Sequence, residues 1–361
     1  MPEPQTHADK RLPVCLLTGF LGAGKSTLLN FLLRHPQMQG TAVVINEYGA
    51  VGIDHHLVES AQEETELVAD GCLCCTASGQ LAEALLSLIE RAQRRKFTLR
   101  RVIIETTGLA EPAPILRQLL SHPQLREQFV LDSVVTLVDA INAPATLDTH
   151  DIAVQQITAA DRLIVTKTDL TSEAQVRQLE QRLAGMNPDA RVDRVVKGAA
   201  RAEQFFDGAH RRAVDGTHIG FMFEQAEKLR FSPVAGPAGR LRLPQGRTPA
   251  DQEIQTFSLI LDEPILASTF LGWLDFLRTL CGPTLLRVKG LVNLQGQAAP
   301  TVVHGVQNVF HPVRPLEGWP SEDRRTRLVF ITRGWGQDAV GSTLDWLRAR
   351  STDRAAAGKP A

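Results

Sequence analysis

A glycine-rich segment near the N-terminus has the residue types and spacing that bind a nucleotide triphosphate. Residues 19–26 read GFLGAGKS and match the pattern G-x-x-x-x-G-K-[ST] at every fixed position. An apolar run precedes them and a leucine-rich run follows, which is the strand–loop–helix context of a phosphate-binding loop; the alternative is a glycine-rich turn that binds nothing. We expect lysine to reach the β- and γ-phosphates and act in catalysis, serine to bind Mg²⁺, and the whole segment to hold nucleotide: Gly19, Gly22, Ala23, Gly24, Lys25, Ser26 and Thr27.

A second polar segment, Thr166-Lys167-Thr168-Asp169, follows another apolar run and has the form [NT]-K-x-D. An aspartate carboxylate accepts hydrogen bonds from N1–H and the 2-amino group of guanine, which adenine does not present in that place. The aliphatic stem of a lysine packs over the base. We therefore predict that Thr166, Lys167 and Asp169 select GTP, the alternative being an ordinary polar loop.

Carboxylates end two further strand-like runs. Glu105 comes after residues 102–104 and is followed by Gly108, so it is placed to hold Mg²⁺ through water while the glycine approaches the γ-phosphate. The alternative for Glu105 is a structural carboxylate. Residues 46–54 are polar and contain glycines, as expected of a switch loop, and we assign Glu47 and Asp54 to Mg²⁺, to a second metal or to the attacking water. Lys25, Glu105 and Asp54 are the catalytic candidates.

Three cysteines lie within four positions, at Cys72, Cys74 and Cys75. Thiolates at this spacing suit Zn²⁺ or Cu⁺. A closed structural zinc site has four protein ligands, and a second C-x-x-C is missing from the chain, so an exchangeable fourth position favours transfer of the metal. The alternatives are a redox pair and buried cysteines without a role. Cys15 is predicted to lie in the core, and Cys281 has no local cysteine partner.

Alternating strand-like and helix-like segments are expected to bring these motifs together. Such a pattern predicts an α/β fold with a mostly parallel sheet covered on both faces, with ligands beyond the carboxyl ends of the strands. The strand-like segments are residues 14–18, 42–46, 102–105, 134–139 and 163–166. The helix-like segments are residues 26–34, 81–95, 112–121, 152–160 and 172–184.

The second half of the chain predicts a smaller α/β domain. Residues 201–251 are rich in Gly, Pro and Arg and read as a linker. Strands are expected at 254–261, 285–294, 301–310 and 327–331, with an amphipathic helix at 266–280. The predicted division is a nucleotide-binding domain at 12–205, a linker at 206–253, a second domain at 254–345 and a disordered tail at 346–361.

Composition restricts the class of protein. The 361 residues are 43% hydrophobic, and 39 Lys and Arg against 40 Asp and Glu give a formal net charge of −1. This balance argues against binding to nucleic acid or a membrane surface through charge. The sequence has no apolar run of 18 residues, no signal-peptide pattern near Met1 and no disulfide framework, so a cytoplasmic protein is expected.

These motifs together resemble the CobW-type GTPase family. The matching segments are residues 19–26, 46–54, 72–75, 105–112 and 166–169, with 286–290 and 304–307 in the second domain. A C-x-C-C cluster inside a phosphate-loop GTPase is highly specific to this family. The resemblance covers about residues 12–335 and implies a SIMIBI-type GTPase domain followed by a CobW C-terminal domain.

The resemblance implies a function as well as a fold. Family members resemble metal chaperones or insertases in which metal lies on the cysteine motif between two switch regions. By resemblance, Cys72, Cys74 and Cys75 bind the metal and Glu47 is an accessory ligand. The expected protein hydrolyses GTP with Mg²⁺ and delivers Zn²⁺ to a client apo-metalloprotein. It binds neither nucleic acid nor membrane, and the expected assembly is a homodimer.

Two other functions compete with the metallochaperone. One is a GTP-dependent assembly or regulatory protein, of the cobalamin or nitrile hydratase activator type, that transfers no zinc. The other is a small-molecule kinase, which the guanine motif at Thr166–Lys167–Thr168–Asp169 and the lack of an evident acceptor pocket disfavour.

Overall fold

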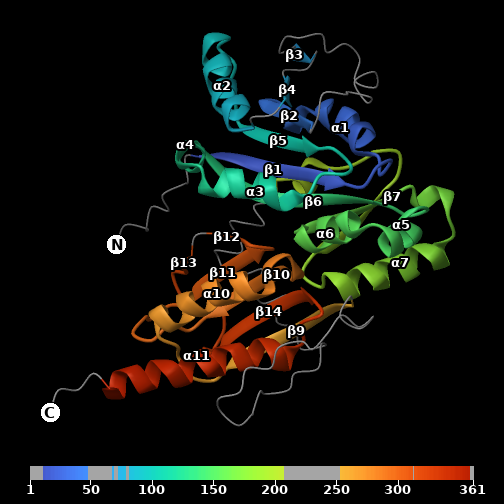
Figure 1. The fold of residues 1–361 in the computed structure, drawn as a ribbon. Coiled ribbons are helices and arrows are strands. Elements are labelled where there is room, and N and C mark those ends of the chain that lie inside the picture. Colours follow the sequence, from blue (N-terminus) through green and yellow to red (C-terminus); the bar gives the residue numbers. More distant parts are fainter. Residues whose placement is uncertain are drawn as a thin grey trace. The chain divides into compact units, whose positions relative to one another are not determined.

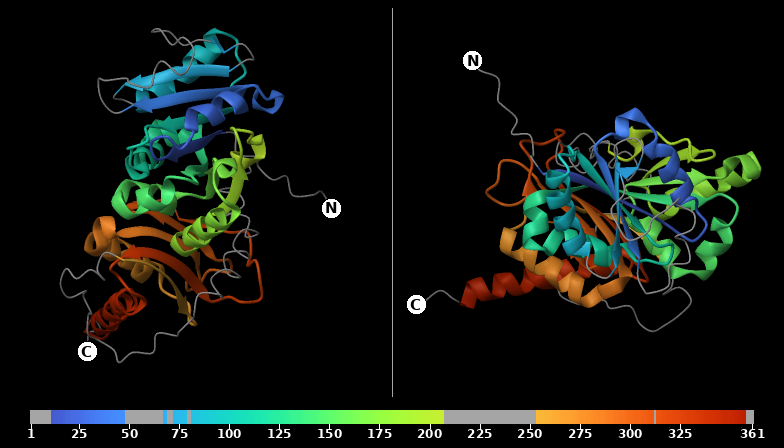
Figure 2. Two further views of the ribbon diagram at one scale, coloured as in Figure 1. Left: turned by 90° about the vertical axis from the view of Figure 1, so that its right-hand side faces the viewer. Right: turned by 90° about the horizontal axis from the view of Figure 1, so that it is seen from above.

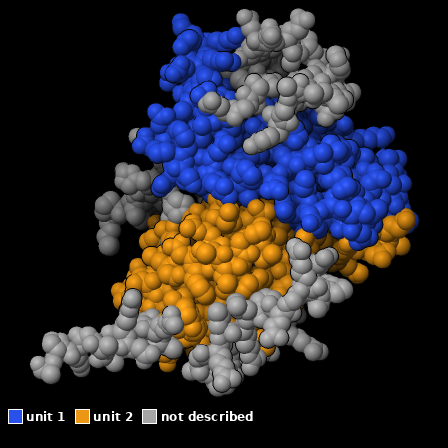
Figure 3. All heavy atoms as spheres, viewed as in Figure 1, with its two compact units in different colours: residues 1–156, 162–173, 192–208 blue, residues 157–161, 174–191, 209–361 orange. Residues whose placement is uncertain are grey.

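The computed structural model describes residues 11–47, 67–68, 72–78, 81–206, 253–311 and 313–357. The chain divides into two compact units (Figure 3). The first contains Met1–Gln156, Arg162–Glu173 and Val192–Gly208. The second contains Ile157–Asp161, Ala174–Arg191 and Ala209–Ala361. The predicted boundary near residue 205 differs from this division, because residues 157–161 and 174–191 group with the C-terminal part of the chain.

Among the described residues, the first unit is built on an eight-stranded sheet with the order β3-β4-β2-β5-β1-β6-β7-β8 (Figure 1). Pairs β4–β2, β2–β5, β5–β1, β1–β6 and β6–β7 are parallel, as predicted, and β3 runs antiparallel to β4. The strands are β1 (Leu12–Gly19), β2 (Thr41–Glu47), β3 (Leu67–Val68), β4 (Cys72–Ser78), β5 (Arg101–Thr106), β6 (Phe129–Asp139), β7 (Arg162–Thr166) and β8 (Arg191–Val195).

Helices cover both faces of this sheet. Viewed from above, α1 lies on one side of the sheet and α2 and α3 on the other (Figure 2). Helix α2 shows why: its buried residues Leu81, Leu85, Leu88 and Ala92 recur at helical spacing and form one apolar face. The helices of the first unit are α1 (Lys25–Leu33), α2 (Leu81–Arg94), α3 (Pro112–Ser121), α4 (Pro123–Gln128), α5 (Ala143–Thr149) and most of α6 (Asp151–Ala159). Helix α7 (Glu173–Met186) belongs to the second unit from residue 174 on.

The second unit contains an antiparallel sheet with the order β12-β11-β10-β14-β9, and β13 pairs with β11. Its core includes Phe257, Trp273, Val288 and Phe330, and the Trp273 indole donates a hydrogen bond to the Thr343 hydroxyl at 2.7 Å. The elements are β9 (Ile254–Leu261), α10 (Ala267–Cys281), β10 (Leu285–Val292), β11 (Thr301–Val306), β12 (Val309–Phe310), β13 (Arg314–Pro315), β14 (Thr326–Arg333) and α11 (Gln337–Ala357).

Helix α11 differs from the sequence prediction. A disordered tail was predicted for residues 346–361, but α11 continues to Ala357. Trp346 stacks on Phe276 of α10 with ring centroids 5.4 Å apart, which holds the helix beyond residue 345. The alanines that follow have high helix propensity. Among the described residues, no helix combines the length and apolar character needed to cross a membrane.

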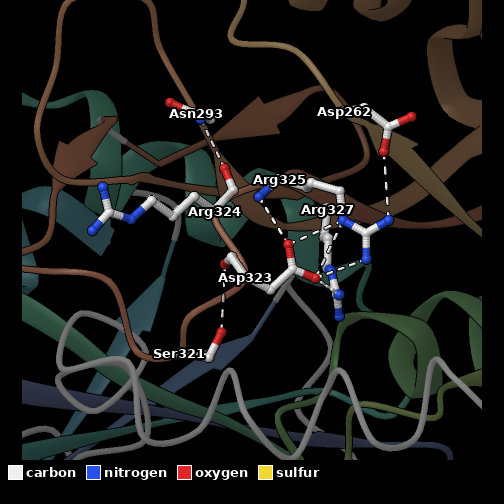
Figure 4. A network of polar contacts seen from close by, with 7 residues as sticks. All are labelled: Asp262, Asn293, Ser321, Asp323, Arg324, Arg325 and Arg327. Atoms are coloured by element: carbon white, nitrogen blue, oxygen red, sulfur yellow. Dashed lines mark hydrogen bonds and ion pairs between the residues drawn. The ribbon is translucent and has the colours of Figure 1, made fainter.

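A charged network fixes the turn that leads into β14 (Figure 4). The Asp323 carboxylate accepts hydrogen bonds from Nε of Arg325 at 3.0 Å and from its Nη2 at 2.8 Å, and it also pairs with Arg327. Arg325 reaches Asp262 at 3.4 Å. Because Arg325 and Asp262 are substantially exposed, their pair is expected to contribute less than about 1 kcal/mol to stability.

Candidate functional site

The phosphate-loop segment connects β1 to α1, as predicted. Gly24 has φ 94° and lies directly before α1, in a left-handed conformation that glycine adopts without steric strain. The Lys25 ammonium group donates to the carbonyl oxygen of Gly19 at 2.7 Å and to that of Phe20 at 3.4 Å. The first turn of α1 has no acidic residue, so the partial positive charge of the helix start is not neutralised there. The loop is therefore suited to an anion.

Ser26 and Glu105 lie together at the ends of neighbouring elements. Strand β1 pairs with β5 in a register that places Leu17 opposite Glu105, and the Ser26 hydroxyl donates to Oε1 of Glu105 at 3.4 Å. Glu105 is buried. A hydroxyl and a carboxylate are the oxygen ligands that Mg²⁺ prefers, so this pair fits the predicted metal ion.

The loop after β5 is held against the phosphate loop. A Cβ at Gly108 would lie 2.6 Å from the backbone nitrogen of Leu21, so only glycine allows this approach. Nε2 of Gln156, a buried residue of α6, donates to the carbonyl oxygens of Gly108 and Ala110, each at 3.1 Å. Gln156 is not among the residues predicted from the sequence, and the neighbouring Gln155 shows that a glutamine in this helix is no distinguishing signal.

The predicted guanine-binding segment also contacts the phosphate loop. The buried Thr166 hydroxyl donates to the carbonyl oxygen of Ala23 at 2.9 Å. Lys167 follows with φ 58° and pairs through Nζ with Oδ2 of Asp139 at 2.7 Å. Asp169 lies in the short helix η2 (Thr168–Leu170) and is exposed, so its carboxylate is accessible to a ligand. The structure thus brings Gly19, Ala23, Lys25, Ser26, Glu105, Gly108 and Thr166 into one site.

The cysteines and Glu47, which are predicted to bind a metal, lie on two neighbouring strands. Cys72, Cys74 and Cys75 lie in β4, next to β2, with Cys74 opposite Val43 in parallel register. Glu47 is the last residue of β2. Asp54 lies outside the described residues. Convergence of these side chains on a metal remains a prediction.

The prediction that Cys15 belongs to the core is confirmed, since it is fully buried beside α1.

A mostly parallel sheet with this loop after its first strand, a carboxylate near the end of β5 and a T-K-x-D segment that begins at the last residue of β7 defines a P-loop nucleotide-binding protein. Comparison with family models agrees: residues 13–194 match CobW/HypB/UreG, nucleotide-binding domain, and residues 254–348 match Cobalamin synthesis protein cobW C-terminal domain. The chain belongs to the CobW/HypB/UreG family, which confirms the resemblance predicted from its motifs.

Similarity to individual relatives extends over nearly the whole chain or over about half of it. It is 32% identical over 342 residues to the zinc chaperone YjiA of Escherichia coli (strain K12), covering 93% of this chain and 99% of that protein. It is 36% identical over 188 residues to zinc-regulated GTPase metalloprotein activator 1 of Schizosaccharomyces pombe, covering 50% of this chain and 45% of that protein. The crystal structure of Zn(II)-bound YjiA GTPase from E. coli superposes with a TM-score of 0.69 at 29% identity, covering 94% of this chain and 99% of that one.

Proposed function

We propose that this protein is a GTP-hydrolysing metallochaperone that delivers zinc to a client metalloenzyme, with its nucleotide state controlling zinc affinity. The observation that carries the proposal is the placement of both motifs in one sheet. Strand β4 contains the cysteines and pairs with β2, and β2 pairs with β5, which contains Glu105. Similarity to the E. coli zinc chaperone over nearly the full length of both chains supports it.

The proposed nucleotide chemistry depends on positioning and charge. The phosphates take the place of the Gly19 and Phe20 carbonyls as partners of Lys25, and the N–H groups of Gly22, Gly24 and the start of α1, including Thr27, surround them. Ser26 and Glu105 hold Mg²⁺, directly or through water. Bound Mg²⁺ neutralises charge that develops on the phosphoryl oxygens as water attacks and GDP leaves.

Recognition of the base uses the segment after β7. Asp169 accepts hydrogen bonds from the guanine edge, and the Lys167 stem packs over the ring. Thr166 connects this segment to the phosphate loop through Ala23, so base and phosphates are bound by one continuous surface. Gly108 lies against Leu21 of the same loop and is assigned to sense the γ-phosphate.

The zinc ion is the cargo in this proposal. Cys72, Cys74 and Cys75 bind it as thiolates, with Glu47 as an accessory oxygen ligand, and Asp54 is assigned to the metal or to the attacking water. Three thiolates leave a fourth position through which a ligand of the client enters, and zinc then moves by successive ligand exchange without any redox change. We assign zinc release to GTP hydrolysis. Strand β2, which carries Glu47, pairs with both the cysteine strand β4 and the Glu105 strand β5, so it connects the two sites.

Zinc titration against a strong competing chelator tests the proposal. We expect at least a tenfold difference in zinc affinity between the protein bound to a non-hydrolysable GTP analogue and the protein bound to GDP. Replacement of Cys72, Cys74 and Cys75 by Ser should abolish the tight site, whereas Cys281→Ser, at a buried position of the second unit, should leave it intact. Equal zinc affinity in both nucleotide states, with the triple variant binding like wild type, would overturn the proposal.

GTP hydrolysis is measured separately from zinc binding. Purified protein with GTP and Mg²⁺ should release phosphate, and Lys25→Ala should lower the rate at least a hundredfold, because the lysine is the cation assigned to the β- and γ-phosphates. Release of phosphate from ATP at the same rate would contradict the assignment of guanine specificity to Asp169.

A further inference from the structure

Asp139 lies at the carboxyl end of β6 and belongs to none of the nucleotide-binding motifs predicted from the sequence. Strand β6 pairs with β7 so that Asp139 lies opposite Thr166. The carboxylate is 6% exposed. Its Oδ1 accepts from the backbone N–H of Ile141 at 2.9 Å and that of Asn142 at 3.4 Å, and its Oδ2 accepts from Nδ2 of Asn142 at 2.8 Å and from Nζ of Lys167 at 2.7 Å.

These donors keep the group charged and fixed in orientation. Burial by itself would raise the pKa of Asp139, but hydrogen bonds from Lys167, Asn142 and Ile141 outweigh burial and hold the pKa below its usual value. Three of the four donor contacts come from the turn that directly follows the strand. One side of the carboxylate is thereby anchored, and Oδ2 is presented to the lysine.

The backbone conformation of Lys167 has to be held by surrounding contacts. It has φ 58°, a left-handed conformation that costs a residue with a side chain about 1–2 kcal/mol. Such a conformation persists where surrounding contacts determine it. On one side, the carbonyl oxygen of Thr166 accepts from the backbone N–H of Ala140 at 3.0 Å. On the other, η2 begins directly after Lys167 and contains Asp169, so the Lys167 dihedral angles set the direction of that carboxylate.

We propose that Asp139 is a positioning residue for guanine recognition, which acts by holding Lys167 in the conformation that directs Asp169 toward the base. The inference rests on the GTP binding proposed above. Asp139 itself does not touch the nucleotide in this scheme. Without its carboxylate, Nζ of the half-exposed Lys167 is released to water, the backbone relaxes to negative φ, and Asp169 turns away. ATP binding depends on the phosphates and stacking alone, so guanine loses more affinity than adenine.

Asp139→Asn in the full chain is the central test, because the amide keeps the shape and one acceptor but faces Lys167 with N–H donors. Affinities for GDP and ADP are measured by calorimetry with Mg²⁺ present. We expect the preference for GDP over ADP to fall at least tenfold, with ADP affinity within threefold of wild type. The matched control is Asp193→Asn, which removes an ion pair with Arg162 at the opposite end of β7 and should leave the preference unchanged.

Lys167→Met examines the same link from its other end, and it also serves if Asp139→Asn does not fold. It keeps an aliphatic stem over the base but removes the ammonium group. Its preference for GDP should fall as in Asp139→Asn, and the double variant should show no further loss, because both changes break one contact. A purely structural role for Asp139 would lower the melting temperature without altering the GDP-to-ADP ratio.

The outcomes separate this inference from the proposed function. If wild-type protein shows no preference for GDP over ADP, guanine recognition by this site is wrong. If wild type prefers GDP and either variant keeps that preference within twofold, guanine recognition stands and the positioning role of Asp139 is refuted.

Discussion

Replacing Arg287 by Met is expected to destabilise the second unit strongly. Arg287 of β10 and Asp161 are both buried, with side chains 1% and 3% exposed. Nη2 of Arg287 donates to Oδ1 of Asp161 at 2.7 Å. Its Nη1 donates to the carbonyl oxygens at the end of α6: Thr158 at 3.2 Å, Ala159 at 2.6 Å and Ala160 at 2.9 Å. One guanidinium group thus binds a carboxylate and the negative end of a helix.

The size of the expected stability loss follows from the polar groups that lose Arg287 as a partner. Removing one partner of a buried ion pair costs about 3–5 kcal/mol, because the remaining charge stays out of water. Two local features favour the lower end of that range. Ala160 keeps a second donor, Nδ2 of Asn187 at 2.9 Å. Arg287 is also one of the groups that lower the pKa of the buried Lys289, after desolvation, so its removal relieves a repulsion. We expect a loss of about 3 kcal/mol.

Tryptophan fluorescence during urea unfolding measures this loss in the correct unit. All four tryptophans of the chain, at positions 273, 319, 335 and 346, belong to the second unit. The control is Arg325→Met, since Arg325 is an arginine of the same unit whose ion pairs are exposed and should change stability by less than about 1 kcal/mol.

A second substitution distinguishes the cause. Adding Asp161→Asn to Arg287→Met removes the stranded carboxylate, so the double variant should be more stable than Arg287→Met alone. The reasoning fails if Arg287→Met unfolds at the same urea concentration as Arg325→Met, or if Asp161→Asn destabilises it further.

Three further predictions concern single groups. Burial raises the pKa of Cys281 to about 12, so only about one thiol in ten thousand is ionised at pH 8; a disulfide reagent should leave it unmodified in native protein and modify it in urea, and fast native labelling would contradict this. Gln156→Leu removes both donors to the loop of Gly108 and should slow GTP hydrolysis about tenfold at nearly unchanged GDP affinity; an unaltered phosphate-release rate would count against the role of Gln156. The pKa of Asp139 is lower in the folded protein than the ordinary value of 3.8, so the charged carboxylate stabilises the fold above pH 3.8. This stabilisation is lost as the pH falls from 3.8 through the lower pKa of the folded state, so the stability difference between wild type and Asp139→Asn should shrink below pH 3.8. Circular dichroism measures both stabilities, and a difference that stays constant with pH would refute this prediction.

The strands that could be predicted from sequence are those buried on both faces. Strands β1, β5, β6 and β7 are continuous apolar runs, and helices α2 and α7 show helical periodicity. Strand β8 reads RVDRV and is partly exposed, so its sequence has no such signal. Helices α4 and α5 are six and seven residues long, which is too short for periodicity to identify. The cysteine-rich β4 is a strand because it pairs with β2, and its own sequence carries no signal for that pairing.

Some residues of the candidate site could be predicted from the sequence and others could not. The phosphate loop, Glu105 and Thr166 have residue types and spacings that the chemistry requires, so they could be predicted. Asp139 and Gln156 could not, because each lies within a segment that reads as an ordinary strand or helix. Their roles come from contacts 28 and 48 residues away along the chain, with Lys167 and Gly108 respectively, and such contacts exist only after folding.

The two compact units are interleaved along the chain, which crosses between them after residues 156, 161, 173, 191 and 208. No single cut in the gene separates them. A fragment that stops at residue 205 retains Asp161 but lacks the arginine that binds it. During synthesis, the end of α6 leaves the ribosome more than a hundred residues before Arg287, so this part of the second unit waits for the C-terminal sheet. Exchange of N- and C-terminal halves between relatives would therefore separate contacts that the fold requires, such as the Arg287–Asp161 pair.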